Sequence, residues 1–196
     1  MKRFLPYLLF GVLAVFLVSC VTGVVMSRKD SLTRPSEGKA IVNFMTPFWG
    51  GLAKPVMATI WDGDKLIGVS RGKLAFQYEC DPGKHLFISW SEFKSPVEAE
   101  LLPNRMYYIV LRTRMGGFRA RIHQVPVNKD HPLWEKALAW HKALPNFVFD
   151  QEAFQKLEAE GKQNILVYLE KYDHEIKGTK YVQYLRPEDG VPPQQQ

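Results

Sequence analysis

The sequence contains only two cysteines, Cys20 and Cys80, among its 196 residues. A disulfide framework needs several cysteine pairs, and a thiolate zinc site needs closely spaced cysteines, so both classes of protein are excluded. The five histidines are scattered along the chain and show no metal-ligand spacing. We therefore expect neither a bound metal nor any other cofactor.

Catalytic signatures are also scarce. The Gly-Gly pairs lie in predicted turns and not between a strand and a helix, where a phosphate-binding loop would need them. Asp173, His174 and Glu175 are consecutive residues of a predicted helix, so their side chains point in different directions. The other acidic residues single out no acid–base pair. The sequence therefore predicts a protein that is not an enzyme.

The charge of the chain argues against a further class of partner. The formal net charge is +6, a modest basic excess that suits an anionic surface. Basic and aromatic residues do not form the repeated pattern that is typical of nucleic-acid-binding segments. We expect no nucleic acid among the partners of this protein.

What the sequence does have is a long apolar run near its N-terminus. Lys2 and Arg3 precede this run, and residues 4–27 contain no charged side chain. A basic segment, an apolar segment and a small residue in this order are typical of an export signal. Leu17-Val18-Ser19-Cys20, embedded in the run, resembles the lipobox of bacterial lipoproteins. That resemblance implies removal of residues 1–19 as a signal peptide and acylation of Cys20.

The lipobox implies a location as well as a modification. The protein would work in the bacterial cell envelope, held on a membrane by its lipid and facing the periplasm or the exterior. Two or more acyl chains are enough to hold a protein stably on a bilayer. Val21 follows the cysteine, which resembles the outer-membrane default of enteric-type bacteria. The outer membrane is therefore favoured if the cell is Gram-negative.

An uncleaved, single-pass signal anchor is the alternative. About 20 apolar residues can cross a bilayer, and residues 21–26 stay apolar beyond the cysteine. Both interpretations place the bulk of the chain outside the cytoplasm.

The exported part divides by composition. Residues 20–38 are expected to form the lipidated N-terminus and a polar linker that lifts the domain off the membrane. Residues 39–127 contain short β-rich segments separated by turn residues, which predicts a mainly β fold, an antiparallel β-sandwich of seven to eight strands. The expected strands are residues 40–45, 56–61, 66–70, 74–80, 85–90, 97–102, 106–115 and 118–125.

Helical periodicity replaces the β pattern in residues 128–178. Two C-terminal helices are expected, the second starting after a capping residue, Asp150, and running to about residue 177. Gly161 lies on the apolar face of this second helix, where it either breaks the helix or permits close packing. Residues 179–196 are expected to be an irregular tail, with a last short strand at 179–185 as the alternative. The apolar stripe of the first helix is Leu133, Ala137, Trp140 and Leu144.

Short turn motifs carry a family resemblance. Asp62-Gly63-Asp64-Lys65-Leu66-Ile67-Gly68 and Asp81-Pro82-Gly83-Lys84-His85 resemble the turns of small envelope β-domains of the PEGA-like type. The arrangement is similar to a family of functionally uncharacterised bacterial lipoproteins that join such a domain to a helical tail. In some of them the tail ends much like Leu185-Arg186-Pro187-Glu188-Asp189-Gly190. The resemblance implies an extracytoplasmic fold and no catalytic residues.

One predicted hairpin concentrates positive charge. If Gly116-Gly117 is a two-residue loop, Arg114 pairs with Arg119 and Arg112 pairs with Arg121. The apolar residues of both strands then share the opposite face, which supports this register. Facing like charges are destabilising, so something should offset them. A candidate anion- or partner-binding site follows, in which guanidinium groups bind phosphate oxygens: Arg112, Arg114, Arg119 and Arg121.

Internal neutralisation is the alternative for this arginine face. A short loop at residues 103–105 would place Glu98 and Glu100 beside the arginines, and Glu158 and Glu170 of the second helix would cover the rest. A second candidate surface, the loop with Phe48 and Trp49, would contact sugar or membrane, or pack against the domain.

These observations predict a membrane-tethered envelope lipoprotein whose β-domain is a non-catalytic structural or protein-binding module. A lipid- or polysaccharide-binding accessory protein that uses the basic hairpin face is the alternative. The expected partners are the membrane, through the lipid on Cys20, and an envelope protein or an anionic lipid.

Overall fold

A computed structural model describes residues 26–47, 57–115 and 120–193. The predicted signal and lipidation segment, the Phe48–Trp49 loop and Arg119 lie outside these ranges, so their predicted roles stay predictions. Within the described ranges, no helix is long and apolar enough to cross a membrane.

The described chain contains eleven strands, which hold almost half of its residues. All eight strands expected from the sequence are present, with ends that differ by a few residues. They are β2 (Ala40–Thr46), β3 (Met57–Asp62), β4 (Lys65–Arg71), β5 (Leu74–Cys80), β6 (Gly83–Trp90), β7 (Lys94–Leu101), β8 (Arg105–Met115) and β9 (Ala120–Val127). Three short strands were not among them: β1 (Met26–Arg28), β10 (Phe147–Phe149) and β11 (Gln183–Leu185).

The strands form two large sheets and a small ribbon. One sheet has the order β11-β7-β6-β3-β4, the other has the order β5-β2-β8-β9, and β1 pairs with β10. The prediction of a wholly antiparallel arrangement is wrong in two places, because β2 runs parallel to β8 and β11 runs parallel to β7. A parallel pair needs a long crossover. Here the chain between β2 and β8 forms β5 and four strands of the other sheet, and the chain before β11 passes through the helices.

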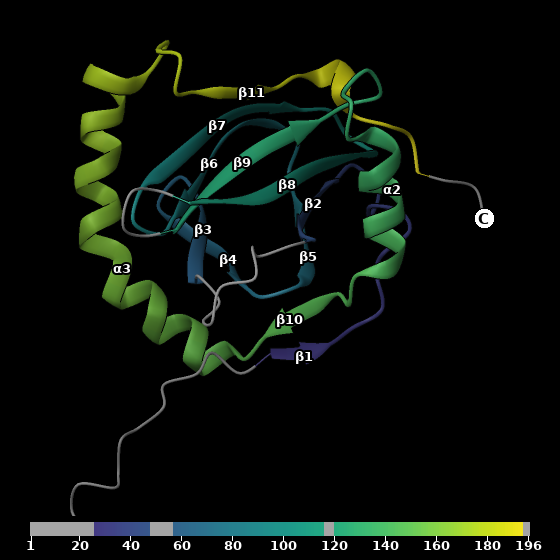
Figure 1. The fold of residues 1–196 in the computed structure, drawn as a ribbon, viewed down its shortest axis with the longest axis horizontal. Coiled ribbons are helices and arrows are strands. Elements are labelled where there is room, and N and C mark those ends of the chain that lie inside the picture. Colours follow the sequence, from purple (N-terminus) through teal and green to yellow (C-terminus); the bar gives the residue numbers. More distant parts are fainter. Residues whose placement is uncertain (1–25, 48–56, 116–119, 194–196) are drawn as a thin grey trace, which may run out of the picture.

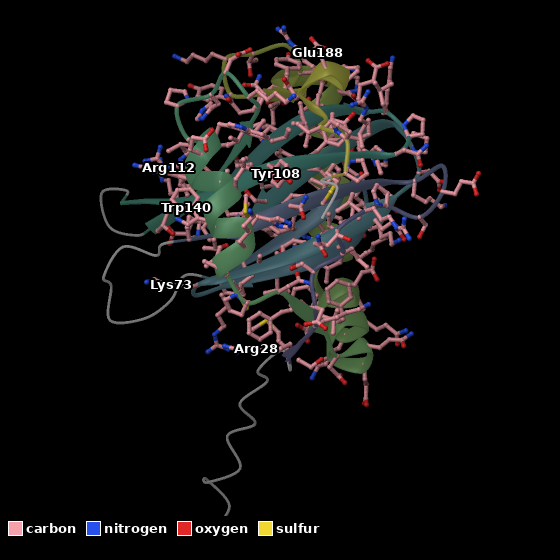
Figure 2. The ribbon with its side chains drawn as sticks, turned by 90° about the vertical axis from the view of Figure 1, so that its right-hand side faces the viewer. Arg28, Lys73, Tyr108, Arg112, Trp140 and Glu188 are labelled. Carbon is pink, nitrogen blue, oxygen red and sulfur yellow. The ribbon has the colours of Figure 1, made fainter. Side chains whose placement is uncertain are left out.

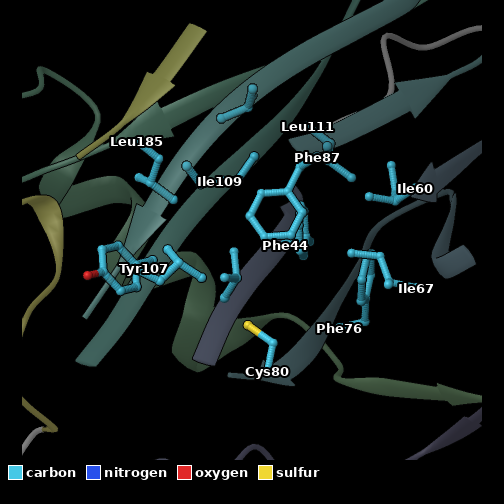
Figure 3. Packing of buried hydrophobic residues seen from close by; sticks show 14 of the residues in the cluster. Phe44, Ile60, Ile67, Phe76, Cys80, Phe87, Tyr107, Ile109, Leu111 and Leu185 are labelled. Carbon is cyan, nitrogen blue, oxygen red and sulfur yellow. The ribbon is translucent and has the colours of Figure 1, made fainter. Parts of the chain in front are cut away.

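The largest hydrophobic core lies between the two large sheets. Phe44 of β2 stacks on Phe76 of β5 with ring centroids 4.8 Å apart and meets the edge of Phe87 from β6 (Figure 3). The Cys80 side chain points into the same cluster and is 7% exposed. Aromatic pairs in these geometries add stability beyond the area that they bury. The core therefore joins residues of both sheets into one unit.

Each sheet also has a helix on its outer face, so the molecule has four layers (Figure 1). Helix α2 (Trp134–Ala143) covers the four-stranded sheet and packs Ala137 and Trp140 against Met45, Tyr108 and Val110. Helix α3 (Gln151–Lys171) covers the five-stranded sheet, and Ile165 and Tyr168 pack on its buried side. The predicted apolar stripes of both helices are confirmed. A π-helical turn, Tyr172–Ile176, continues α3.

Gly161 explains how closely α3 approaches its sheet. A Cβ atom at this position would lie 2.6 Å from Cζ2 of Trp61 in β3, far inside van der Waals contact. The helix continues through Gly161 without a break, so close packing, and not helix termination, is the reason for the glycine. The cap at Asp150 is as predicted, since its carboxylate accepts from the Ala153 amide at 3.0 Å.

The segment expected to be a free linker is part of the folded domain. β1 pairs with β10 in register from Met26–Phe149 to Arg28–Phe147. Beyond it, the Leu32 amide donates to Gln77 at 2.6 Å and the Ser36 amide to Glu79 at 2.6 Å, both from the edge strand β5. A polar segment remains a free linker only when no neighbouring strand offers it hydrogen-bond partners. Here the side chains of the edge strand β5 offer such partners.

The C-terminal tail is likewise folded, so the prediction of an irregular tail is wrong and its alternative, a last short strand within residues 179–185, is confirmed. β11 adds to the edge of β7, and the Val191 backbone bridges Met106. Tyr107 holds this tail: its hydroxyl donates to the Pro187 carbonyl at 3.2 Å and accepts from the Leu102 amide at 2.8 Å. Asp189 is buried and accepts from Asn128 at 2.7 Å. The motif at residues 185–190 is therefore a structural clasp.

We expect Gly161→Ala to destabilise the fold by about 1–3 kcal/mol, because the added methyl group would force Trp61 away from α3. Helix propensity alone predicts the opposite sign, a gain of about 1 kcal/mol. Urea unfolding of the detergent-solubilised full chain measures the difference. The double variant Gly161→Ala/Trp61→Phe should recover part of the loss; a stabilised single variant would contradict the packing role.

We expect Tyr107→Phe to cost about 1–3 kcal/mol of unfolding free energy, because the Leu102 amide loses its acceptor inside the structure. The tail should also become accessible, so limited proteolysis should cleave near residues 186–193 faster than in the wild type. Tyr184→Phe is the matched control, since the Tyr184 side chain is 48% exposed. Equal cleavage rates in all three proteins would show that Tyr107 does not hold the tail.

Candidate functional site

The predicted arginine hairpin exists, but in a different register. β8 ends at Met115 and β9 begins at Ala120, so Arg114 faces Arg121 and Arg112 faces His123. The predicted pairs, Arg114 with Arg119 and Arg112 with Arg121, are wrong because the connection spans four residues instead of two. The shift is two residues, which preserves the assignment of side chains to faces. Ile109, Leu111 and Ile122 accordingly lie in the core between the sheets.

The arginine face is only partly assembled by the described residues. Arg112 is exposed, whereas the guanidinium group of Arg121 lies 3.7 Å above the Phe93 ring, and its buried Nε atom has no hydrogen-bond partner among the described residues. Arg119 lies outside the described residues, and the Arg114 side chain is not described. The structure thus places Arg121 in a cation–π contact. A joint anion site of all four arginines stays a prediction.

The acidic residues expected to neutralise these arginines lie elsewhere. Strand β7, which carries Glu98 and Glu100, belongs to the other sheet. Glu98 accepts from the Tyr172 hydroxyl at 2.7 Å, and Glu158 accepts from the Leu66 amide at 3.0 Å. Both carboxylates therefore help to attach α3 and its π-helical turn to the five-stranded sheet. The proposed neutralisation by Glu98 and Glu158 is wrong.

A cleft that the sequence did not predict opens beside the N-terminal strand. We call it the β1 cleft. It encloses about 920 Å³ between the chain at residues 28–33, the start of β8, and the C-terminal end of α2 with residues 144–146. Arg28 lies at the end of the domain where the described chain begins, below α2 and Tyr108 (Figure 2). No sequence motif signals this cleft, because its walls are far apart along the chain.

Basic side chains dominate the rim of the β1 cleft. Arg28, Lys29 and Lys142 line it, with Asp30 as the acidic member. Among the described residues, none of these three cations lies within ion-pair distance of a carboxylate. His141 also lines the cleft, and burial lowers the pKa of its imidazole, so it is neutral near pH 7. The positive charge of the cleft therefore comes from the arginine and the two lysines.

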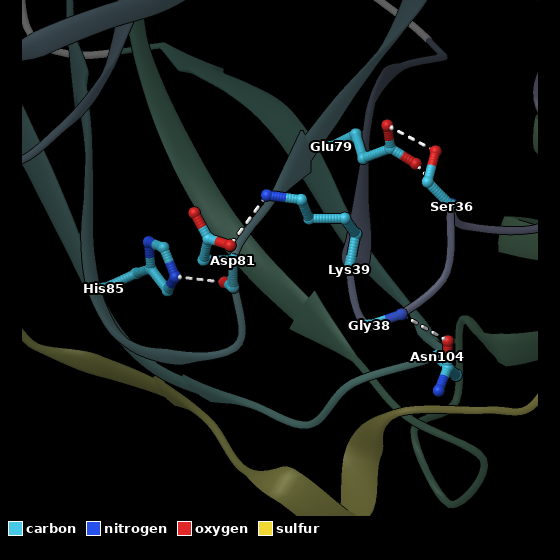
Figure 4. Close-up of polar contacts among 7 residues, drawn as sticks. All are labelled: Ser36, Gly38, Lys39, Glu79, Asp81, His85 and Asn104. Carbon is cyan, nitrogen blue, oxygen red and sulfur yellow. Dashed lines mark hydrogen bonds and ion pairs between the residues drawn. The ribbon is translucent and has the colours of Figure 1, made fainter.

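A second polar cluster joins the two turn motifs. His85 Nδ1 lies 2.7 Å from Asp62 Oδ2, and the Tyr78 hydroxyl donates to the same oxygen at 3.1 Å. The other ring nitrogen of His85 lies 2.9 Å from the Asp81 carbonyl oxygen, at the corner where β5 crosses to β6 (Figure 4). Lys39 and Asp81 form an exposed ion pair nearby, at 2.7 Å. The cluster ties a hairpin of one sheet to a strand of the other.

Electrostatics in this cluster favour a structural role. The hydrogen bond with Asp62 raises the pKa of His85 against the opposing effect of burial. Burial, followed by the charge of Asp62, raises the pKa of the Tyr78 hydroxyl and raises that of the Cys80 thiol to about 12. A thiol with such a pKa is protonated at neutral pH and is a poor nucleophile. Cys80 is therefore a buried, unreactive thiol.

One catalytic-looking motif went unnoticed in the sequence. Gly68-Val69-Ser70-Arg71-Gly72 matches the nucleophile pattern Gly-x-Ser-x-Gly. In the structure Ser70 is completely buried within β4, and its hydroxyl lies 2.8 Å from that of Thr46. The following element is strand β5 and not a helix, so the strand-to-helix elbow of the motif is missing. The match is coincidental.

Metal ligation finds no support in the described ranges, where no three His, Cys, Asp or Glu residues are grouped so that they could hold an ion.

We expect the His85–Asp62 pair to make stability depend on pH. Because folding raises the pKa of His85, its contribution is fully present below the unfolded value of about 6.5 and is lost as the pH rises through the folded value. His85→Gln should therefore lower the unfolding free energy more at pH 5.5 than at pH 8.5. Urea unfolding at both pH values measures this difference.

His174→Gln is the matched control, since His174 is exposed on the π-helical turn. The unfolding free energy of this variant should change with pH in the same way as that of the wild type. If His85→Gln lost the same free energy at both pH values, the ion pair would not be the cause.

Comparison with known proteins identifies no family for this chain. No family model and no curated protein matches it. Among solved structures, it is similar to the N-terminal domain of AlgF from P. aeruginosa, at 16% sequence identity and a TM-score of 0.28. The similarity covers 46% of this chain and 98% of the AlgF domain. A score this low supports no argument about fold or function.

Proposed function

We propose that this protein is a membrane-tethered lipoprotein of the bacterial cell envelope, anchored through acylated Cys20. Its β-domain acts as a non-catalytic module that binds an envelope protein. In a Gram-negative cell the anchor lies in the outer membrane, in keeping with Val21.

The observation that carries this proposal is the short distance between the lipobox and the folded domain. β1 begins at Met26, six positions after Cys20. Six extended residues span at most about 20 Å. Because β1 is paired with β10, the proposed tether would hold this end of the domain close to the bilayer. An uncleaved anchor would bring it at least as close.

The use of polar side chains supports a non-catalytic role. Asp62, His85 and Asp189 are the polar residues that the turn and tail motifs bring into the fold, and each is engaged in hydrogen bonds that join separate elements. Catalytic groups need unengaged atoms directed at a substrate. These motifs hold the scaffold together instead.

The end of the domain opposite β1 supplies a surface for a protein partner. β11 and the end of α3 lie at that end in Figure 1. Tyr181 and Tyr184 there are 68% and 48% exposed, and Leu166 and Val167 of α3 are exposed as well. Exposed tyrosines are typical of interface centres. A tether at one end would present this surface away from the membrane.

A second candidate function uses the arginine face. Arg112 is exposed and lies in a strand beside Arg114 and Arg121, which favours binding of an anionic lipid or polysaccharide. Arg112→Glu should then weaken binding to anionic vesicles and reduce its dependence on salt. Binding of a protein partner to the end of the domain that carries β11 would not respond to this change.

The tether is tested by intact mass spectrometry of protein extracted from membranes, comparing wild type with Cys20→Ala. We expect a wild-type N-terminus at Cys20 that carries acyl mass, and loss of that mass in the variant. Full-length, unacylated chains in both samples would indicate that residues 4–26 are a transmembrane anchor and would contradict the lipoprotein proposal.

A further inference from the structure

We propose that the β1 cleft binds the phosphate group of a membrane phospholipid headgroup. The inference rests on the tethering proposed above and adds to it a specific contact between the domain and the lipid surface.

The cations of the cleft are available to a ligand. Arg28, Lys29 and Lys142 are exposed side chains, and none is neutralised by a described carboxylate. Arginine donates two parallel hydrogen bonds to phosphate oxygens, and lysine adds a point charge. With Asp30 in the same cleft, the formal charge of the lining is about two units positive. That charge suits a phosphodiester, which carries a single negative charge.

The floor of the cleft, its most deeply buried lining, is mainly apolar: Met106 and Tyr108 of β8 are 2% and 1% exposed, and Asn146 is the buried polar member. Leu144 and Pro145 also line the cleft. Tyr108 is fixed by edge contacts with Trp134 and His141, at centroid distances of 5.6 Å each. A charged rim over an apolar floor matches the boundary between a phosphate and the glycerol and acyl groups behind it.

The backbone around the basic side chains is already ordered. β1 is paired with β10, and the Lys29 amide donates to the Asn146 carbonyl at 3.0 Å. The next residues of the wall are held by the Ala75 amide, which donates to the Pro145 carbonyl at 2.9 Å. Binding therefore does not have to order a loop first, which lowers its entropic cost.

Position favours a lipid over a soluble phosphate. Arg28 and Lys29 follow Cys20 by eight and nine residues, so the cleft stays within about 30 Å of the bilayer at full extension. A tethered site meets headgroups at a high effective concentration, which a free ligand would not match. Basic residues next to a membrane anchor are also attracted by anionic lipids.

Native mass spectrometry of the full chain in uncharged detergent tests the proposal. The probes are dioleoylphosphatidylglycerol, dioleoylphosphatidylcholine and glycerol 1-phosphate. We expect a phosphatidylglycerol adduct, and an affinity about tenfold lower in Arg28→Glu/Lys142→Glu, because two charge-assisted contacts are lost. Arg28→Lys/Lys142→Arg, which keeps both charges, should retain most of the binding and guards against a variant that fails to fold.

The matched control is Lys129→Glu/Lys180→Glu, which makes the same change in net charge at exposed sites remote from the cleft. It should bind phosphatidylglycerol like the wild type. An equal loss in this control would mean unspecific attraction and would overturn the site. Glycerol 1-phosphate binding as tightly as the lipid would assign the cleft to a soluble phosphate ester and overturn the lipid proposal, as would a wild type without any adduct.

The same spectra report the mass of the whole chain, which shows whether the signal segment has been removed and Cys20 acylated. They therefore separate the two proposals. Acylated Cys20 without a lipid adduct would refute the cleft and leave the tether intact. A lipid adduct lost in the cleft variant of an unacylated chain would support the cleft and refute the lipoprotein.

Discussion

The fold depends on one constraint: strand β2 is buried along its entire length on both faces. Its alternate side chains point into two different cores, Val42 and Phe44 toward the five-stranded sheet and Ile41 and Met45 toward α2. A strand of this kind is stable only when both faces of its sheet are covered. The second sheet and α2 supply the two covers. The parallel pairing with β8 follows from the same arrangement, because the chain builds one cover before it returns beside β2.

The ends of the domain are organised around these layers. After α2, the chain must cross from one outer face to the other to form α3, and it does so along the open end of the core. β10 lies on that crossing, and β1 pairs with it. Met26, Phe147 and Phe149 pack against the main core from this end. The β1 cleft is thus a consequence of how α2, β8 and the N-terminal segment meet, and the described chain begins beside it.

The sequence predicted the parts that depend on local chemistry. Alternating apolar residues and turn residues such as Gly63 placed all eight principal strands, and the spacing of Ala137 and Trp140 placed α2. It also assigned the hairpin faces correctly while missing the register, since a shift of two residues keeps every side chain on its face. The free linker and the loose tail were wrong, because each depends on which strand edge lies nearby. The arginine pairs were wrong because the connection between β8 and β9 is two residues longer than predicted.

The sequence by itself determined the apolar N-terminal run with its tetrapeptide that resembles a lipobox, the mainly β composition and the apolar faces of both helices. Such features follow from the order of neighbouring residues, which sets solubility, periodicity and turn geometry. Only the tertiary structure decided that Gly161 faces Trp61, that Asp62 meets His85, and that Arg28 and Lys142 share a cleft. Those contacts join residues far apart in the chain, and they arise because burying both faces of β2 fixes where every other element lies.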